Sequence, residues 1–324
     1  MAVTFGRVLD NKTSTRIERE VASAIKRQGS DWKGNTFYTL LLVMLVLTLF
    51  ILAVLIYGVV ADGWDIITGW LPSFLGGTLG SIKAFEGQTL GVQQGLAGSF
   101  WIAVFVALLS FPIGIASAIY LEEYAPKNRF SNFIELNIRN LAGVPSVVYG
   151  LLGLFLFVEG IPSITGGRTA ASAGLTLAIL VLPIVIITSQ EALRAVPAAL
   201  KEGSYGVGAT RWETVRRQAL PYAAPGILTG TLLSMSRAIG EAAPLILVGA
   251  ITGFLGSNPS IVDPGQLDDA FTAMPILITG WTQNPMPEFR VAAAAAIVVL
   301  LVFVLLLNAA TIYLRYHFEK KREA

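Results

Sequence analysis

The stretch Phe37–Val60 reads FYTLLLVMLVLTLFILAVLIYGVV and contains no charged residue. A helix needs about 20 apolar residues to cross the hydrocarbon core of a bilayer. Apolar and polar residues do not alternate in Leu40–Leu49, as they would in a strand of a membrane barrel. Because a backbone in lipid must satisfy its own hydrogen bonds, this stretch predicts a transmembrane helix.

Five more stretches of the chain are long and apolar enough to cross a bilayer. The sequence therefore predicts an all-α membrane protein with six transmembrane helices, in a transmembrane domain that covers residues 37–314. The fifth helix is interrupted by Arg237 and Glu241. The six predicted spans lie at about 37–60, 96–121, 137–158, 170–190, 223–254 and 291–314.

The composition argues against several classes of protein. An ordinary soluble domain has about 25% charged residues, whereas this chain has 14% charged and 54% hydrophobic residues. A large soluble core is therefore a poor alternative. The net charge of +2 is too small to indicate a nucleic-acid partner. The chain has no cysteine, and its one histidine is His317, so we expect neither a thiolate nor a histidine-built metal site.

The distribution of Lys and Arg predicts the orientation, because cytoplasmic loops carry an excess of both. These residues are concentrated before the first predicted span, between the second and third, between the fourth and fifth, and after the sixth. The opposite side carries only Lys83, Arg168 and Arg290. We therefore expect a cytoplasmic basic segment at 1–36, a cytoplasmic tail at 315–324, and both termini on the cytoplasmic side.

The two long loops expected outside, Asp62–Gly95 and Gly256–Glu288, are rich in Gly, Pro and Trp. Trp64, Trp70 and Trp281 suit the membrane–water interface, where aromatic side chains anchor spans. Contact with an external partner is the alternative for the same side chains.

The loop 198–221, between the fourth and fifth predicted spans, has the signals of two short helices. Pro197 suits the first turn of one helix. Thr210 predicts the start of the other, with Glu213 three residues later completing a capping box. Leu220-Pro221 is expected to close the unit. The glycines expected to break the first helix are Gly203, Gly206 and Gly208. An ordinary basic loop is the alternative to such a rigid protrusion.

This loop resembles the EAA motif of ABC importer permeases, which is Glu-Ala-Ala, three residues, Gly, nine residues, then Ile-x-Leu-Pro. The chain has Glu202-Gly203-Ser204, Gly208 and Gln218-Ala219-Leu220-Pro221 at that spacing, with both alanines and the isoleucine replaced. In the family this segment is a coupling helix that docks on an ATPase. The resemblance gives that role to Glu202, Gly203, Ser204, Tyr205, Gly208, Leu220 and Pro221.

The chain itself has no nucleotide-binding loop, because no Gly-Lys pair occurs in it. We therefore expect no cofactor in this chain and expect ATP and Mg to be bound by a separate ATPase subunit.

Arg237 and Glu241 are charged residues inside a predicted span. Arg237 lies about 21 Å along the helix from Ala223, and an arginine at mid-membrane costs at least about 2.5–3.5 kcal/mol. A guanidinium donates hydrogen bonds in a fork that suits a tetrahedral oxyanion. A substrate pathway with Arg237, Glu241 and the small Ser236 is one interpretation, and a structural salt bridge is the other. Asn140 and Ser146, near the start of the third span, are further candidates for the pathway, with an interfacial position as their alternative.

Several segments together resemble the PstA family, permease subunits of bacterial phosphate ABC importers. The resemblance covers about Leu96 to the C-terminus. It implies the type I ABC importer permease fold, and uptake of inorganic phosphate by alternating access across a prokaryotic plasma (inner) membrane. In the family, the arginine that matches Arg237 is linked to phosphate passage. The segments are Phe111–Tyr124, Asn140–Gly150, the loop 198–221, Ser236–Leu245 and Pro275–Trp281.

The same resemblance implies partners. It implies a heterodimer with a PstC-type permease, a PstB-type ATPase dimer in the cytoplasm and a PstS-type phosphate-binding protein outside. The chain would then be a transport subunit and not itself an enzyme. Two hypotheses from other classes remain, a self-sufficient secondary carrier of anions and a membrane scaffold or sensor. The EAA-like loop argues against the carrier, and Arg237 with Glu241 argues against the scaffold.

Overall fold

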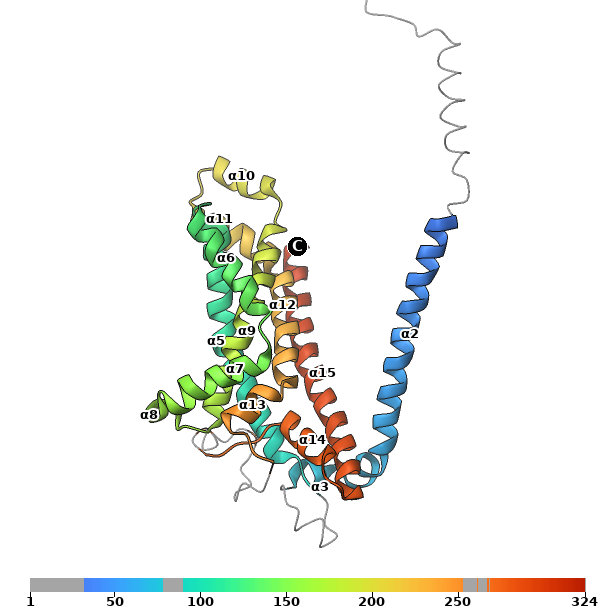
Figure 1. Cartoon of the computed structure of the whole chain (residues 1–324). Coiled ribbons are helices and arrows are strands. Elements are labelled where there is room, and N and C mark those ends of the chain that lie inside the picture. Colours follow the sequence, from blue (N-terminus) through green and yellow to red (C-terminus); the bar gives the residue numbers. More distant parts are fainter. Residues whose placement is uncertain (1–31, 78–89, 253–260, 262–266, 268, 324) are drawn as a thin grey trace, which may run out of the picture. The chain divides into compact units, whose positions relative to one another are not determined.

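The computed structural model describes residues 32–77, 90–252, 261, 267 and 269–323, and within them every regular element is a helix. Some of the basic residues used to predict the orientation lie outside the described part, namely those of residues 1–27, Lys83 and the side chains of the basic tail. Long helices alternate with short ones and with π-helical segments (Figure 1). The elements are α2 (Trp32–Asp62), η1 (Ile66–Trp70), α3 (Leu71–Gly76), α5 (Gln93–Ile119), η2 (Tyr120–Tyr124), α6 (Arg129–Ala142), α7 (Ser146–Gly153), η3 (Leu154–Glu159), α8 (Pro162–Thr165), α9 (Ala170–Arg194), α10 (Ala198–Gly206), α11 (Arg211–Thr214), η4 (Val215–Ala219), α12 (Leu220–Gly240), α13 (Ala243–Val248), α14 (Met274–Thr282) and α15 (Pro287–Glu323).

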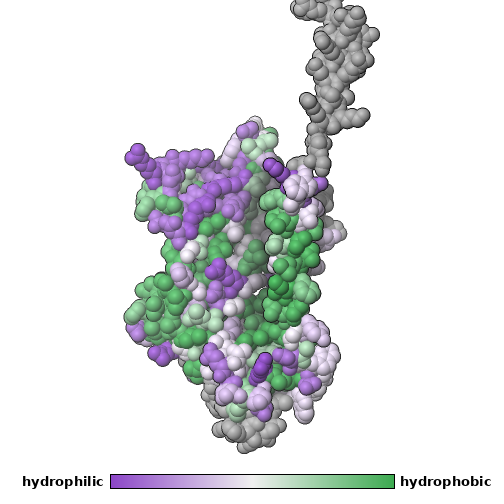
Figure 2. Space-filling model, turned by 45° about the vertical axis from the view of Figure 1, so that its right-hand side comes forward, coloured by the Kyte–Doolittle hydropathy of each residue, from purple (hydrophilic) through white to green (hydrophobic). Residues whose placement is uncertain are grey.

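Among the described residues, four helices are each long and apolar enough to cross a membrane, namely α2, α5 with η2, α9 and α15. A fifth span results if α6 and the α7–η3 segment are counted together. The prediction of an all-α membrane protein is thus confirmed, whereas the count of six spans is not reached by this criterion. On the face of the bundle that Figure 2 shows, hydrophilic residues gather at both ends, and hydrophobic residues are most frequent between them.

The chain divides into two compact units, Met1–Gly58 and Val59–Ala324. The described part of the first unit is the greater part of α2, which has 31 residues in all. At 1.5 Å per residue this helix is about 46 Å long, enough to cross the hydrocarbon core with turns to spare.

The second unit is a helix bundle in which α9 is the central element. α5 and α12 pack against α9, and α15 packs against α12 (Figure 1). Leu177, Val181 and Val185 of α9 are fully buried. Small residues let the helices approach closely, as is common in membrane bundles. The Ser110 hydroxyl of α5 donates to the Ala178 carbonyl of α9 at 2.7 Å, which fastens the two helices at their interface.

The predicted third span, 137–158, is not one helix. α6 ends at Ala142, and the axis turns by 100° before α7 and η3. The cause is Pro145, which has no N–H to continue α6 and disfavours the helical conformation of the residue before it. The Tyr149 hydroxyl donates to the Leu141 carbonyl at 2.9 Å, so one carbonyl freed by the break is satisfied across the bend.

The predicted fifth span, 223–254, also differs. Its helix begins earlier, because α11, η4 and α12 follow one another without a break from Arg211 to Gly240. Leu220-Pro221 therefore does not close the loop. The π-helical turn η4 ends at Ala219, two residues before Pro221, and such a turn tolerates the missing N–H of the proline. At the other end, Glu241 has an extended ψ of 119° and terminates α12.

Candidate functional site

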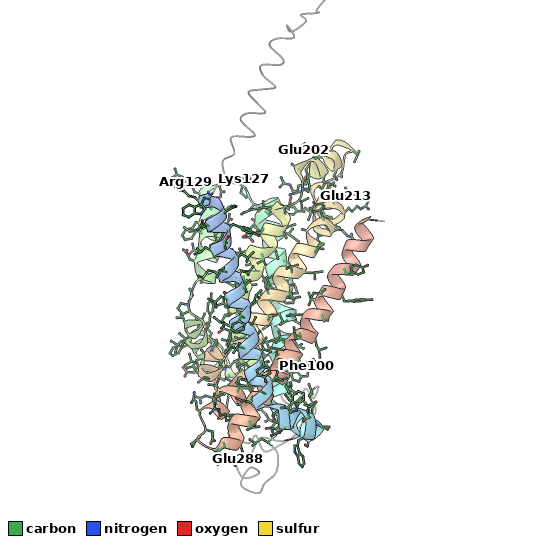
Figure 3. The ribbon with its side chains drawn as sticks, turned by 90° about the vertical axis from the view of Figure 1, so that its right-hand side faces the viewer. Phe100, Lys127, Arg129, Glu202, Glu213 and Glu288 are labelled. Atoms are coloured by element: carbon green, nitrogen blue, oxygen red, sulfur yellow. The ribbon has the colours of Figure 1, made fainter. Side chains whose placement is uncertain are left out.

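The segments that connect the helices lie at two opposite ends of the bundle. Lys127 and Arg129 lie at the same end of the molecule as Glu202 and Glu213, and Glu288 lies at the opposite end (Figure 3). The connection between α5 and α6 and the one after α9 therefore share one end. This arrangement agrees with the alternation that the distribution of Lys and Arg predicts.

Residues 198–214, which we call the knob, form two short helices joined by a glycine turn. α10 ends in a Schellman motif, in which Gly208 N–H donates to the Tyr205 carbonyl at 2.9 Å and Ala209 N–H to the Ser204 carbonyl at 3.1 Å. Gly208 has a φ of +85°, the left-handed conformation that this motif requires. The prediction that Gly203 and Gly206 also break the helix is wrong, because both lie within α10.

The second helix of the knob starts at the predicted capping box. Glu213 N–H donates to the Thr210 hydroxyl at 3.3 Å, and the carboxylate of Glu213 accepts from Thr210 N–H at 2.9 Å. That backbone N–H, followed by the Thr210 hydroxyl, lowers the pKa of the Glu213 carboxyl below its usual value. The capping box is confirmed, and it fixes the direction in which α11 leaves the turn.

The outer face of the knob is open. Glu202, Gly203 and Tyr205 of α10 are exposed, and a Cβ placed on Gly203 or Gly208 meets nothing within 4 Å. Ser204 is instead turned inward, and its Oγ lies 2.9 Å from the Thr214 Oγ1, which joins α10 to α11.

Four more residues complete the description of the knob and its surroundings. Two apolar side chains that the sequence interpretation missed, Val207 at 87% and Trp212 at 58% exposure, also lie on the knob. Their signal was a large apolar residue within a polar loop. Of the candidates beyond the knob, Pro221 is exposed at the start of α12, and Leu220 packs against the core.

Arg237 lies in the last turn of α12, and its Nε is 3.3 Å from the Glu241 Oε1. The two residues do not lie inside one continuous helix, as the predicted fifth span implied, since Glu241 is the residue at which α12 ends. The ion pair forms nevertheless, with Arg237 at 51% and Glu241 at 20% exposure of their side chains. The Ser236 hydroxyl donates to the Asn308 Oδ1 of α15 at 2.8 Å. Asn308 was missed, although it is the one amide in the apolar stretch 291–314.

The depth of Arg237 follows from the register of α12 against α9. Gly226 approaches Ala192, and Gly230 approaches Thr188, so the two helices run antiparallel. Continued by two turns, this register brings Arg237 level with Val181, which is near the middle of α9. An exposed guanidinium at this depth cannot face lipid at low cost. This face of α12 therefore suits water or another protein.

The remaining candidates, Asn140 and Ser146, lie on α6 and α7 on either side of the bend. Asn140 is exposed, and Ser146 is half-buried in the first turn of α7. No hydrogen bond joins either side chain to Arg237 in the described parts of the chain. The two regions are nonetheless neighbours, because α7 packs on α13, which follows Glu241.

The described residues contain no cluster of three or more His, Cys, Asp or Glu that could hold a metal ion. The polar groups in and beside the last turn of α12 include a guanidinium, a carboxylate, a hydroxyl and an amide, the groups of Arg237, Glu241, Ser236 and Asn308. Of these, only the guanidinium carries a positive charge and can pair with an anion.

A family model described as "Binding-protein-dependent transport system inner membrane component" matches residues 110–323. The chain belongs to this family. It is 32% identical over 292 residues to the phosphate transport system permease protein PstA 1 of Mycobacterium tuberculosis (strain ATCC 25618 / H37Rv), covering 90% of each chain. It is 33% identical over 242 residues to the probable ABC transporter permease protein YqgI of Bacillus subtilis (strain 168), covering 72% of this chain and 81% of YqgI.

Solved structures share the fold. A chain of a bacterial alginate ABC transporter, in complex with an alginate pentasaccharide-bound periplasmic protein, matches with a TM-score of 0.57 and 15% identity, covering 87% of this chain and 96% of that one. A chain of a bacterial ABC transporter that imports the acidic polysaccharide alginate matches with a TM-score of 0.53 and 18% identity, covering 87% and 98%. The bundle therefore has the fold of an ABC importer membrane subunit.

Proposed function

We propose that this chain is the transmembrane permease subunit of an ATP-driven ABC importer that takes up inorganic phosphate by alternating access. The observation that carries the proposal is a half-exposed arginine, Arg237, level with the middle of the bundle. A fixed cation at this depth attracts an anion, and its forked donors suit a tetrahedral oxyanion. The PstA relative at 32% identity over 90% of the chain supports phosphate as that anion.

In the proposed topology, the chain has the type I importer permease fold and crosses the plasma (inner) membrane six times. α2, α5, α9 and α15 cross as single helices, α6 with α7–η3 crosses as a bent pair, and α12 with α13 makes the remaining span. An even number of spans leaves segments 1–36 and 315–324 on the same side. The excess of Lys and Arg favours the cytoplasm for both termini and for the end with the knob.

The proposed pathway runs along the exposed face of α12. Leu233, Arg237 and Gly240 are exposed and follow helical spacing. We assign the opposite wall to a PstC-type permease in a heterodimer, since the described part of the second unit by itself leaves this face exposed. Glu241 competes with the anion for Arg237, which keeps binding weak enough for release.

Three further side chains near this path have supporting roles. Ser236 links α12 to Asn308 of α15 beside the guanidinium. Asn140 and Ser146 would contribute hydrogen bonds from α6 and α7, because α7 packs beside the segment that follows Glu241.

The proposed coupling site is the knob. A PstB-type ATPase dimer, which binds ATP and Mg, would receive Glu202, Gly203 and Tyr205 in a groove together with the exposed Val207 and Trp212. Ser204 and Gly208 hold the two helices of the knob in shape, and Leu220 and Pro221 carry its movement into α12. A PstS-type protein would deliver phosphate at the opposite end.

ATP-driven phosphate uptake by the complete transporter in proteoliposomes tests this proposal. Replacement Arg237→Gln removes a charged hydrogen-bonding partner worth about 1.5–3 kcal/mol, so we expect uptake to fall about tenfold or more. Arg290→Gln, which changes an exposed arginine at the start of α15, is the matched control and should transport normally. Undiminished uptake by Arg237→Gln, with normal subunit assembly, refutes the pathway.

Two further measurements test whether the chain is instead a secondary carrier and whether phosphate is the preferred anion. Phosphate uptake driven by a proton or sodium gradient in liposomes that contain this chain alone would establish a secondary carrier instead. Competition by sulfate or other tetrahedral oxyanions in the complete transporter would show whether phosphate is the preferred anion, because Arg237 alone does not discriminate among them.

A further inference from the structure

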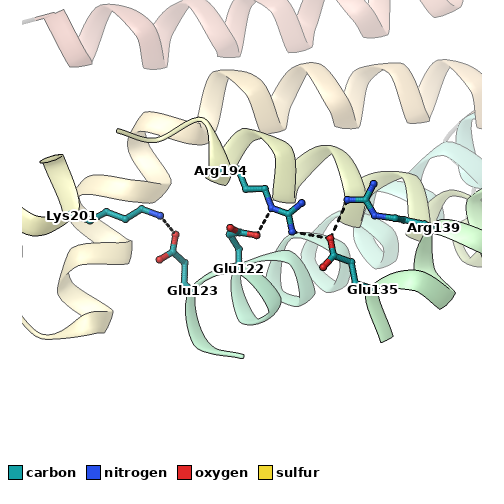
Figure 4. A network of polar contacts seen from close by, with 6 residues as sticks. All are labelled: Glu122, Glu123, Glu135, Arg139, Arg194 and Lys201. Carbon is teal, nitrogen blue, oxygen red and sulfur yellow. Dashed lines mark hydrogen bonds and ion pairs between the residues drawn. The ribbon is translucent and has the colours of Figure 1, made fainter. Parts of the chain in front are cut away.

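Three consecutive side chains at the end of α5 each hold a cation from a different element. In η2, Glu122 Oε2 accepts from Arg194 Nε at 2.7 Å, and Glu123 Oε1 accepts from Lys201 Nζ at 2.5 Å (Figure 4). The ring of Tyr124 lies 5.7 Å from the Arg211 Cζ, within the range of a cation–π contact.

The three cations belong to successive parts of the loop that forms the knob. Arg194 ends α9, Lys201 lies on α10, and Arg211 opens α11. Two of them therefore come from the knob itself, one from each of its helices. The third comes from the helix that enters the knob. We call Glu122, Glu123 and Tyr124 the η2 clamp.

The pair at the centre of the clamp is the most protected of these contacts. The Glu123 side chain is 7% exposed and that of Lys201 is 22% exposed. Surface ion pairs contribute little because water screens them, whereas removal of one partner of a buried pair leaves a costly uncompensated charge. The contact between Glu123 and Lys201 is thus the firmest side-chain link between the knob and α5.

The clamp also reaches α6. Arg194 Nη2 donates to Glu135 Oε1 at 2.8 Å, and Arg139 Nη2 donates to the same oxygen at 3.0 Å. Both Glu135 and Arg139 lie on α6. Through Arg194, the η2 clamp joins the ends of three helices, α5, α6 and α9 (Figure 4).

The backbone gives the knob no direct connection to α5 or α6. It leads from α9 into the knob and from the knob through η4 into α12. Movement of the knob can thus reach α12 and α9 covalently, but it reaches the cytoplasmic ends of α5 and α6 only through side chains. η2 is also π-helical, a local geometry that often marks functional positions.

We infer that the η2 clamp is a second route by which movement of the knob enters the bundle, with Glu123 and Lys201 as its positioning residues. The inference rests on the proposed coupling function and adds to it a specific link to α5. The knob and η2 move as one body during the transport cycle, and their contact does not open and close.

The test measures phosphate molecules transported per ATP hydrolysed by the complete transporter in proteoliposomes. Glu123→Gln and Lys201→Met each remove one charge and keep the approximate shape. We expect each to lower this ratio about threefold or more, the range of coupling between residues in contact. The charge-exchanged double variant, Glu123→Lys with Lys201→Glu, should restore most of the ratio. Glu191→Gln, an exposed carboxylate near the end of α9, is the control and should keep the full ratio.

A second measurement does not depend on how well the single variants fold. The chain has no cysteine, so Glu123→Cys with Lys201→Cys can be joined by a short bis-maleimide. If the clamp moves as one body, the cross-linked protein keeps transporting. A cross-link that stops uptake overturns the inference, as does an unchanged ratio in Glu123→Gln or failure of the charge exchange to restore a lowered ratio. If the unmodified transporter shows no ATP-driven phosphate uptake, the proposed function itself fails.

Discussion

Gly208 is the residue on which the shape of the knob depends, and Gly208→Ala tests this directly. Its φ is +85°, and a Cβ at this position meets no other atom within 4 Å. The substitution therefore introduces backbone strain without a steric clash. Gly203→Ala is the matched control, because Gly203 is equally open but lies within α10 in a helical conformation.

The two substitutions should change the stability of the knob in opposite directions. An L-residue in the left-handed region costs roughly 1–2 kcal/mol, and the reduced freedom of the unfolded chain returns about 0.4–1 kcal/mol. Gly208→Ala should therefore destabilise the turn by about 1 kcal/mol, which is about fivefold in its opening equilibrium. Gly203→Ala should stabilise α10 by roughly 0.5–1 kcal/mol, because glycine is unfavourable inside a helix.

Hydrogen exchange of the purified protein, followed by mass spectrometry of peptides that cover the knob, measures both effects. The Gly208 and Ala209 amides donate to the Tyr205 and Ser204 carbonyls, so they report opening of the turn. We expect exchange about fivefold faster in Gly208→Ala and slower than wild type in Gly203→Ala. Equal exchange in both variants would show that the Schellman motif does not hold the knob in shape.

Two further changes have defined outcomes. Ser99→Ala removes the buried acceptor of the Met274 N–H, a hydrogen bond of 2.9 Å. Thermal unfolding should show a free energy of unfolding lowered by about 1–3 kcal/mol. A decrease below about 0.5 kcal/mol, the level of a neutral substitution, would contradict this. Thr210→Ala removes the cap of α11 and should cost about 0.5–2 kcal/mol. Because the pKa of Glu213 is lowered in the folded chain, its contribution is complete above the usual carboxyl pKa and is lost as the pH falls through the lowered value. That acid-side loss, followed by exchange of the α11 amides, should become smaller in Thr210→Ala but should not disappear, because the Thr210 backbone N–H, the larger cause of the lowered pKa, remains. An unchanged loss would show that the Thr210 hydroxyl does not contribute to the lowered pKa.

Local rules allowed part of this structure to be predicted from the sequence. Long apolar runs predicted α2, α5, α9 and α15 because a bilayer sets the length of the helix that crosses it. The capping box of Thr210 and Glu213 was equally predictable, since both of its hydrogen bonds join residues within one turn. In each case the structure is decided by interactions between residues that are close in sequence, or by the thickness of the bilayer.

The bend in the third span and the early start of the fifth helix were missed because the effect of a proline depends on the residues around it. Pro145 broke the third span although the surrounding residues are apolar, whereas Pro221 did not break the helix that contains it. The difference lies in the preceding backbone, since η4 forms a wider turn before Pro221, and Gly143 ends α6 before Pro145. Proline alone therefore marks a point of strain, and neighbouring residues decide between a bend and a π-helical turn.

The end of α12 combines two features that a lipid environment disfavours separately. Arg237 is half exposed, and the helix stops at Gly240 before α13 begins at Ala243. Exposed charge is costly in lipid, and interrupted backbone hydrogen bonding at membrane depth is tolerated only where protein covers it or water reaches it. The charge and the helix break occur within one turn of each other, so a single wet or protein-covered site satisfies both. Placing that site on the proposed phosphate pathway explains why the chain keeps an arginine and a helix end at this depth, where an uninterrupted apolar helix would be more stable in lipid.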